Sequence, residues 1–201
     1  TRDQQQVWTP IREAMRSSAG GRFLLHGVTG SGKTEIYLRA VDEALAQGQR
    51  ALVLVPEISL TPQTTNRFAA RFPERVAILH SALSDGERFD TWRRARAGLI
   101  DIVIGPRSAL FSPLTPLGVI ILDEEHEDSY KQESPRPYYH ARDTAIALAD
   151  LTSATLILGS ATPSLEATHR ADKGELKRLT LPRRILGHVR RLHDLKTRYH
   201  V

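Results

Sequence analysis

GVTGSGKT, residues 27–34, matches the phosphate-binding pattern G-x-x-x-x-G-K-T at every position. The short apolar run before it, residues 22–26, is typical of a buried strand, and residues 35–46 after it carry apolar side chains at helical spacing. A strand, a glycine-rich turn and a helix in this order let successive backbone N–H groups and the helix N-terminus face phosphate oxygens. The stretch therefore predicts a nucleoside triphosphate site, the alternative being a chance glycine-rich turn.

The residues of this loop have separate expected roles in binding the nucleotide. Lys33 is expected to reach the β- and γ-phosphates and the Thr34 hydroxyl to bind Mg²⁺, so ATP and Mg²⁺ are the cofactors that the loop predicts. The predicted nucleotide contacts in this segment are Gly27, Thr29, Gly30, Ser31, Gly32, Lys33, Thr34 and Glu35.

Composition limits the kind of protein that carries this loop. A chain of 201 residues can bury a full core, and one large domain is the simplest expectation. The absence of cysteine, of an apolar run of membrane-spanning length and of a signal peptide predicts a cytoplasmic protein with neither disulfides nor a membrane partner. The formal net charge is +5, and basic residues gather at 88–98 and from Lys177 to Arg198, which favours a polyanionic partner.

Short aliphatic runs alternate with helical stretches along most of the chain. The predicted strands are Phe23–Leu25, Ala51–Val55, Val76–Leu79, Asp101–Ile104, Val119–Leu122 and Leu156–Leu158. The predicted helices are Thr34–Gln47, Ser59–Arg71, Ser84–Ala97, Ala141–Leu151 and Ser164–Lys173. The apolar runs do not alternate with polar residues, which predicts an α/β fold with a mainly parallel central sheet and helices on both faces. Because the motifs follow strands, they are expected to share one site at the carboxyl edge of that sheet.

VIILDEEH, residues 119–126, is a second sequence with a chemical interpretation. Four apolar residues predict a strand, and carboxylates follow where it ends. In an enzyme with a phosphate-binding loop, Asp123 would hold the Mg²⁺ water shell, and Glu124 would orient and deprotonate the water that attacks the γ-phosphate. His126 is expected either to sense the γ-phosphate or to cap the loop. The alternative is a strand that runs into an ordinary acidic turn. The candidate catalytic residues are Lys33, Asp123, Glu124 and His126, and the candidate metal ligands are Thr34 and Asp123.

ATLILGSATPS, residues 154–164, predicts a third strand that ends in small hydroxyl residues. Ser160 and Thr162, on either side of Ala161, are expected to bond across to the DEEH loop and to couple it to the state of the nucleotide. The alternative is a turn or N-cap before the next helix, a common role for Ser and Thr near Pro.

In this order, the phosphate-binding loop, DEEH and SAT resemble the first RecA-like motor lobe of a superfamily 2 helicase. Longer strings resemble the PriA family of bacterial primosomal replication-restart helicases, also called primosomal protein N′. They are LVPEISLTPQ (54–63), HSALSDGER (80–88), GPRSALFSP (105–113), DEEHEDSYKQ (123–132), YHARD (139–143) and LGSATPSLE (158–166). The resemblance implies a P-loop NTPase lobe at 1–175, with 176–201 as a connector or added strand leading toward a second lobe. It also implies a DNA-stimulated ATPase and 3′-to-5′ DNA helicase that acts at stalled forks.

The resemblance also implies partners and further contact residues. The implied partners are single-stranded or forked DNA, the second RecA-like lobe, the primosome and single-strand-binding proteins. Residues 1–4 are similar to the family's adenine-reading motif, so Gln4 is the implied base contact, the alternative being a polar terminus. The implied DNA contacts are Pro56, Glu57, Arg107, Ser108, Tyr130, Lys131, Arg136, Tyr138, Tyr139 and Arg142.

These DNA contacts fall into two groups with different implied roles. Residues 56–57 and 105–108 match segments with which helicase lobes track a strand through its phosphates, although Pro106 removes one backbone donor. Segment 127–143 resembles an aromatic-rich loop that couples DNA engagement to hydrolysis, with tyrosines stacking on bases and cations meeting phosphates. The alternatives are an ordinary surface charge at Arg107, tyrosines half-buried over the core, and a structural pair between Arg142 and its neighbour.

The arginine finger of such motors normally belongs to the second lobe, so this chain alone is expected to bind nucleotide weakly and to hydrolyse it very slowly. Two other interpretations remain. One is a lobe of a different superfamily 2 translocase, which would lack YHARD and SYKQ. The other is a non-catalytic nucleotide- or DNA-binding module, against which the intact Lys33, Thr34, Asp123 and Glu124 argue.

Overall fold

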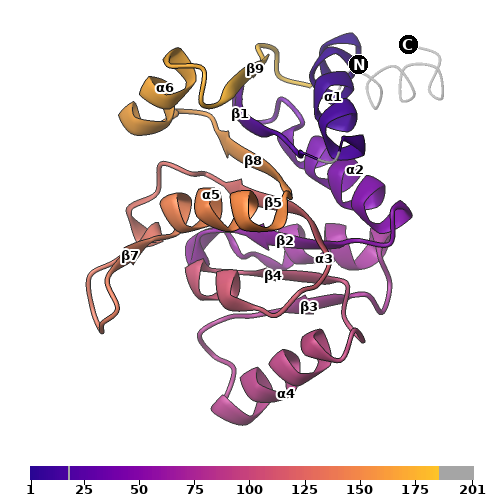
Figure 1. Cartoon of the computed structure of the whole chain (residues 1–201), viewed down its shortest axis with the longest axis vertical. Coiled ribbons are helices and arrows are strands. Elements are labelled where there is room, and N and C mark those ends of the chain that lie inside the picture. The colour runs from indigo at the N-terminus through magenta and orange to yellow at the C-terminus, as the bar shows by residue number, and fades with distance from the viewer. Residues whose placement is uncertain (18, 186–201) are drawn as a thin grey trace, which may run out of the picture.

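The computed structural model describes residues 1–17 and 19–185, in which a central sheet lies between two layers of helices (Figure 1). Within these residues seven strands pair in parallel in the order β3-β4-β2-β5-β8-β1-β9. Their bounds are β1 (Arg22–Gly27), β2 (Arg50–Leu54), β3 (Val76–Ile78), β4 (Ile102–Gly105), β5 (Leu117–Asp123), β8 (Thr155–Ser160) and β9 (Lys177–Leu181). A parallel sheet needs a long crossover after each strand, which the helices provide.

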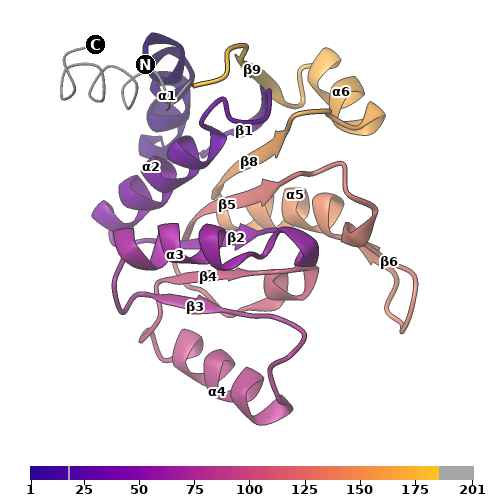
Figure 2. The ribbon, with the colours of Figure 1, turned by 180° about the vertical axis from the view of Figure 1, so that it is seen from behind.

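The helices cover both faces of this sheet. They are α1 (Arg2–Arg16), α2 (Lys33–Ala46), α3 (Pro62–Arg71), α4 (Asp85–Arg96), α5 (Ala141–Thr152) and α6 (Leu165–Asp172). In Figure 1 α5 lies in front of the sheet, whereas in Figure 2, seen from behind, α2 and α3 lie in front of it. Helix α4 lies beyond β3, at the edge of the molecule, in both views.

Two hydrophobic cores result, one on each face. Along β2, Ala51 and Val53 belong to the core that α1, α2 and α3 cover, while Leu52 and Leu54 belong to the core under α5 and α6. Successive side chains of a strand point to opposite faces, so a strand that is apolar at every position fills both cores. This explains why the apolar runs of the sequence do not alternate with polar residues.

Short elements complete the chain at the carboxyl edge of the sheet. Residues Lys131–Gln132 (β6) and Tyr139–His140 (β7) form a small antiparallel pair, and the loop between them projects from the body in Figure 1. The 3₁₀ turns are η1 (Glu57–Ser59), η2 (Arg107–Phe111) and η3 (Asp128–Tyr130). None of the helices in the described residues has both the length and the apolar character needed to cross a lipid bilayer.

The predicted α/β architecture is confirmed, and all six predicted strands are present within a few residues. The helix predicted at Ser59–Arg71 begins later, at Pro62, because the Thr61 hydroxyl accepts the N–H of Thr64 as an N-cap and Pro62 suits the first helical position. Helix α1 was not predicted. Its signals are a capping box between Thr1 and Gln4 and apolar residues four apart at 7, 11 and 15. Of the segment assigned to a connector or added strand, residues 177–181 form β9, and 186–201 lie outside the described residues.

The strand order divides the carboxyl edge of the sheet into two halves. The phosphate-binding loop, DEEH and SAT follow β1, β5 and β8, which are neighbours. The segments that begin at Pro56, Leu79 and Pro106 follow β2, β3 and β4, which are also neighbours. Because ligands of open parallel sheets bind beyond the carboxyl ends of the strands, each half is a candidate binding region.

Candidate functional site

The phosphate-binding loop connects the end of β1 at Gly27 to the start of α2 at Lys33. Gly30 and Gly32 have φ of +79° and +91°, in the left-handed region that favours glycine. At Gly32 a Cβ would also lie 2.5 Å from Nε2 of Gln4, so any side chain there would displace the Gln4 amide. The two glycines therefore allow the backbone conformation of the loop, and the missing side chain at Gly32 leaves space for Gln4 of α1.

The interior of the loop fits a bound phosphate. The Ser31 hydroxyl is buried and has no hydrogen-bond partner among the described residues. A buried hydroxyl without a partner is costly, and a phosphate oxygen would supply the missing acceptor. Lys33 is 8 % exposed, and its Nζ donates to the Gly27 carbonyl at 2.9 Å and lies 3.8 Å from Oε1 of Glu124. The lysine thus points back into the loop, as its predicted role requires.

The other predicted nucleotide contacts surround this interior. Gln4 is buried, and its Nε2 reaches the Gly32 carbonyl at 3.5 Å, so the structure brings the end of α1 to the loop. Thr34 is half-buried in the first turn of α2. Thr29 is exposed, with its carbonyl accepting from Nε of Arg184 at 3.0 Å, and Glu35 is exposed and paired with Arg39 at 2.9 Å.

Asp123 ends β5 and is held by a residue that the sequence did not single out. The hydroxyl of Tyr37, on α2, donates to Oδ1 of Asp123 at 2.7 Å. Burial raises the pKa of Asp123, and the hydrogen bond from Tyr37 opposes that rise. Burial and the nearby Asp123 carboxylate raise the pKa of Tyr37 well above its ordinary value, so Tyr37 remains a donor. A carboxylate and the Thr34 hydroxyl are ligands that Mg²⁺ accepts, so the chemistry of the residues fits this ion.

Glu124 and His126 face each other beside Lys33. Glu124 has a φ of +46°, a left-handed conformation that is uncommon for a residue with a long side chain. Its carboxylate lies between Lys33 Nζ at 3.8 Å and Nδ1 of His126 at 3.7 Å. The side chain is 29 % exposed. The structure thus leaves the Glu124 carboxylate partly exposed between Lys33 and His126, next to the phosphate-binding loop.

The SAT segment bonds across to the DEEH loop, as predicted. Ser160 Oγ lies 2.8 Å from Nδ1 of His126, and Thr162 Oγ1 lies 3.4 Å from Nε2 of the same ring. Ser160 also accepts the N–H of Thr162 at 2.9 Å, and the half-buried Ala161 lies between them. The ring of His126 is therefore fixed by two hydroxyls from the end of the neighbouring strand. The alternative role as an N-cap belongs instead to Ser164, which caps α6.

Glu125 has a structural environment that distinguishes it from the other acids of the loop. Its side chain is completely buried and accepts hydrogen bonds from the N–H and the hydroxyl of Ser164 at 2.8 and 2.9 Å. Nη1 of Arg142 lies 3.4 Å from the same carboxylate and donates to the Ser164 hydroxyl at 2.8 Å. Glu125 thereby joins the end of β5 to the beginnings of α5 and α6.

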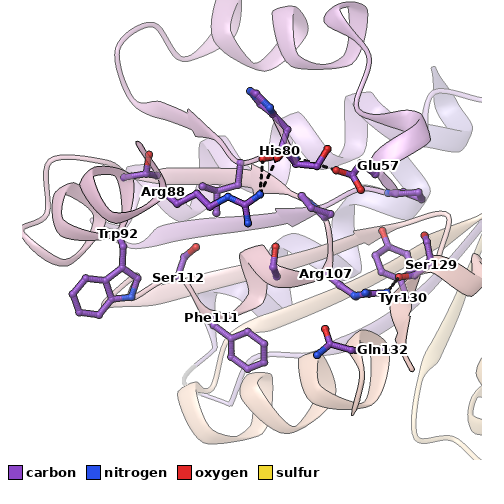
Figure 3. Close-up of a pocket in the computed structure, with 16 residues that line it drawn as sticks. Glu57, His80, Arg88, Trp92, Arg107, Phe111, Ser112, Ser129, Tyr130 and Gln132 are labelled. Carbon is purple, nitrogen blue, oxygen red and sulfur yellow. Dashed lines mark hydrogen bonds between the residues drawn. The ribbon is translucent and has the colours of Figure 1, made fainter. Parts of the chain in front are cut away.

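A groove of about 480 Å³ lies in the other half of the carboxyl edge. The predicted DNA contacts Pro56, Glu57, Arg107 and Ser108 all line it. Figure 3 shows Arg107 beside Ser129 and Tyr130, where its Nη1 donates to the carbonyls of Ser129 and Lys131 at 2.8 and 2.9 Å. Both of these bonds use one of the three guanidinium nitrogens. Arg107 is therefore held in place rather than being a free surface charge.

Two of the DNA contacts that the resemblance implied for the aromatic loop are buried in the structure. Tyr130 is 1 % exposed, and its hydroxyl donates to the Asp123 carbonyl at 2.7 Å, so its ring is not available for stacking on a base. Arg142 is 5 % exposed and belongs to the Glu125 network, so it does not face a phosphate. The structure contradicts both assignments: the turn after β5 places the Tyr130 ring in the core, and the start of α5 places Arg142 against the buried Glu125.

The remaining residues of this loop stay accessible. Tyr138 is 63 % exposed, and the guanidinium of Arg136 lies over its ring, 5.4 Å from the centroid. Lys131 is exposed and paired with Glu133 at 2.8 Å. Tyr139 is half-buried and packs edge-on against Phe111 with 5.3 Å between ring centroids. The tip of the loop thus carries the accessible aromatic and cationic groups.

The sequence did not predict two residues that hold the half of the carboxyl edge formed by β1, β5 and β8, called the nucleotide half below: Tyr37 and Arg183. Tyr37 lies one helical turn after Thr34, and Gly159 leaves room for it, because a Cβ on Gly159 would lie 1.7 Å from the Tyr37 hydroxyl. Arg183 binds both carboxylate oxygens of Asp3 at 2.7 and 2.9 Å, which secures the segment after β9 beside the loop. The glycine of GSAT was a usable signal, whereas the Arg183–Asp3 pair joins residues too far apart in sequence to be predicted.

Comparison with known proteins agrees with this geometry. The profile of the DEAD/DEAH box helicase family matches residues 1–171. The chain is 53% identical over 185 residues to the replication restart protein PriA of Bacillus subtilis and 60% identical over 148 residues to that of Synechocystis sp.. These matches cover 92% and 74% of this chain, but only 23% and 18% of the relatives, so the chain spans about a quarter or less of their length.

Solved structures share the fold at low sequence identity. RecG bound to a three-way DNA junction superposes with a TM-score of 0.67 at 22% identity, covering 98% of this chain and 27% of that one. The Hef helicase domain of Pyrococcus furiosus gives a TM-score of 0.61 at 18% identity, covering 89% of this chain and 38% of that one.

Proposed function

The chain belongs to the DEAD/DEAH box helicase family, and from this premise we propose that it is the ATP-binding motor lobe of a replication-restart DNA helicase. Its similarity to PriA proteins supports this narrower assignment. The parent protein would be a DNA-dependent ATPase of the cytoplasm that unwinds 3′ to 5′ at stalled forks. A second RecA-like lobe, primosome proteins and single-strand-binding proteins would be its partners.

In this proposal the phosphate-binding loop, helix α1 and the end of β5 each contact a different part of Mg-ATP. Ser31, Lys33 and the loop N–H groups would hold the phosphates, and Gln4 would contact the adenine. Thr34 and Asp123 would hold Mg²⁺, which supplies charge neutralisation at the phosphates. Glu124 would accept a proton from the attacking water, its position set by Lys33 and His126.

The observation that carries the proposal is the buried Ser31 hydroxyl, which has no partner within residues 1–17 and 19–185, in a loop into which Lys33 points. We expect Mg-ATP to bind the chain, and Lys33→Ala to weaken binding by at least about tenfold, because a charge-assisted phosphate contact contributes about 1.5–3 kcal/mol. Titration of a fluorescent ATP analogue measures both affinities. Lys173→Ala is the matched control, because Lys173 is an exposed lysine after α6.

Equal affinities of the Lys33→Ala variant and the wild-type chain would contradict the nucleotide assignment. Hydrolysis is a separate question. We expect the chain alone to turn ATP over very slowly, since the arginine finger of such motors comes from the second lobe. Fast DNA-stimulated turnover that Glu124→Gln abolishes would refute this expectation while supporting the role of Glu124.

We further propose that the groove at the ends of β2, β3 and β4 tracks one DNA strand through its phosphates. Arg107, Ser108 and the backbone near Glu57 are groups of the kind that contact phosphates without reading sequence. The affinity for single-stranded DNA should then fall with salt, with a log–log slope of about −0.7 for each neutralised phosphate. Arg107→Ala should make the slope less steep by about one such contact, and a slope that does not change would contradict its role.

A further inference from the structure

The groove has a second property that phosphate contacts do not require. Two large hydrophobic side chains, Trp92 and Phe111, line it while remaining 39 % and 57 % exposed. Figure 3 shows Trp92 at one end of the groove and Arg107 at the other, with Phe111 between them. Exposed aromatic rings that line one concave groove are characteristic of a ligand site rather than of a solvated surface.

Trp92 lies on a helix whose residues are mostly exposed. Helix α4 has one buried residue, Ala95, and lies beyond the edge of the sheet (Figure 1). On α4 the guanidinium of Arg96 lies 5.3 Å from the centre of the Trp92 ring. The Trp92 side chain therefore lines the groove and does not belong to either hydrophobic core.

Phe111 is held in place by a contact with a neighbouring aromatic ring. It ends η2 and packs edge-on against Tyr139, with 5.3 Å between the ring centroids and 77° between the ring planes. This T-shaped contact leaves the Phe111 ring exposed while restricting its motion. The two aromatic walls are thus supplied by elements that are separate in sequence and are joined only by the fold.

The charged groups of the groove favour an anionic ligand. Its acidic and basic lining residues are Glu57, His80, Arg88 and Arg107. The only carboxylate among these lining residues, that of Glu57, accepts the N–H of Ser81 at 3.0 Å. Arg88 donates to the carbonyls of Ser81 and Leu83 at 3.0 and 3.1 Å, which holds its guanidinium at the groove. The groove therefore combines aromatic faces with a surplus of cations.

We propose that this groove holds one unstacked base of a single DNA strand, with Trp92 as the stacking surface and Arg107 on a neighbouring phosphate. Every base has a π-face, so a tryptophan can stack on it without selecting a sequence. A volume of about 480 Å³ is within the range of small-ligand pockets, which suits one base and not a stacked duplex. The inference rests on the proposed strand-tracking function and adds to it a preference for unpaired bases.

The chain offers a direct readout of this stacking. It contains two tryptophans, and Trp8 lies on the buried face of α1, so a Trp8→Phe variant leaves Trp92 as the only tryptophan to report binding. An oligothymidylate of about twelve nucleotides, within the length that one binding site covers, should quench the fluorescence of Trp92. An abasic oligonucleotide of the same length keeps the phosphates and should bind about 5- to 30-fold more weakly without quenching.

Affinity measurements on the otherwise unchanged chain provide an independent test. Trp92→Leu should weaken binding of the oligothymidylate about 5- to 30-fold and leave binding of the abasic strand unchanged. Phe89→Leu is the matched control, because Phe89 is an exposed aromatic on the same helix that does not line the groove. It should alter neither affinity. Fluorescence anisotropy of labelled oligonucleotides gives all of these values.

The outcomes separate this proposal from the one on which it rests. Equal affinity for the two oligonucleotides without quenching, or a Trp92→Leu variant that binds like the wild-type chain, would overturn the base site while leaving phosphate tracking intact. Failure of both oligonucleotides to bind would refute strand tracking and the base site together. An acidic peptide that quenches Trp92 in place of DNA would also overturn the proposal.

Discussion

Arg142→Met tests the assignment of Glu125 and Arg142 to a structural network rather than to ATP or DNA. Arg142 is the cation closest to a completely buried carboxylate, at 3.4 Å, and its own side chain is 6 % exposed. Asp143 and Glu166 also lie within 4 Å of it, at 3.8 and 3.7 Å, but their side chains are 50 % and 66 % exposed. Removing the guanidinium therefore leaves one buried charge, that of Glu125, without a counter-ion.

The magnitude follows from this geometry. Removing one partner of a buried ion pair costs about 3–5 kcal/mol. The distance of 3.4 Å is long for a charge-assisted bond, and both Ser164 bonds to Glu125 remain, so we expect the lower end, about 3 kcal/mol. A domain of this kind is stable by about 5–15 kcal/mol, so the loss is large but leaves a folded protein to measure.

Urea denaturation followed by circular dichroism measures the free energy of unfolding. Arg170→Met is the matched control, because Arg170 pairs with Asp143 and Glu175 at 3.1 and 3.4 Å but is 34 % exposed, and such surface pairs contribute about 0–1 kcal/mol. Adding Glu125→Gln to Arg142→Met removes the unpaired charge and should restore part of the stability. A cost for Arg142→Met no larger than that for Arg170→Met would refute the reasoning.

Three further substitutions test other contacts of the nucleotide half. Asp123→Asn is expected to raise the free energy of unfolding at about pH 7: burial raises the pKa of Asp123, so the folded chain binds this proton more tightly than the unfolded chain and loses stability as the pH rises through the interval between the two pKa values. The stability advantage of the variant should shrink at about pH 4. Urea denaturation at the two pH values measures it, and an advantage that is the same at both would contradict the prediction. Asp3→Asn should behave in the opposite way. Arg183 lowers the pKa of Asp3, so the pair stabilises the fold above the unfolded pKa and is lost as the pH falls through the folded pKa; thermal melts should differ at neutral pH and converge in acid. Gly159→Ala should cost about 1–3 kcal/mol, because the new Cβ would lie 1.7 Å from the Tyr37 hydroxyl, and Tyr37→Phe should relieve part of that cost; simple addition of the two losses would contradict the contact.

Much of the fold could be predicted because it depends on local patterns. Continuous apolar runs with helical segments between them specify a parallel sheet covered on both faces, and all six runs that were identified became strands. The exceptions also have local causes. The α1 helix begins in a polar stretch whose capping box is a weak signal, and Thr61 delays the start of α3.

The candidate site was predicted less completely, because a residue's side chain can turn toward the ligand or toward the core with the same sequence around it. Tyr130 and Tyr138 both belong to the aromatic loop, yet one is 1 % and the other 63 % exposed. Glu124 and Glu125 are adjacent, but the left-handed backbone at Glu124 leaves it beside Lys33 while Glu125 is buried against Ser164. A loop has no regular periodicity from which the direction of its side chains could be predicted.

The sequence alone determined the chemistry at the strand ends. The phosphate-binding loop and the acidic pair are each a continuous stretch of sequence, and the elements that flank each stretch are enough to predict its role. Tertiary structure decided which partners these groups have. Tyr37 holds Asp123 because α2 packs against the sheet beside β5. Trp92 and Phe111 line one groove because β3 and β4, the strands that precede α4 and η2, are neighbours. These contacts join residues distant in sequence, and their geometry depends on strand order and helix packing, which no local pattern contains.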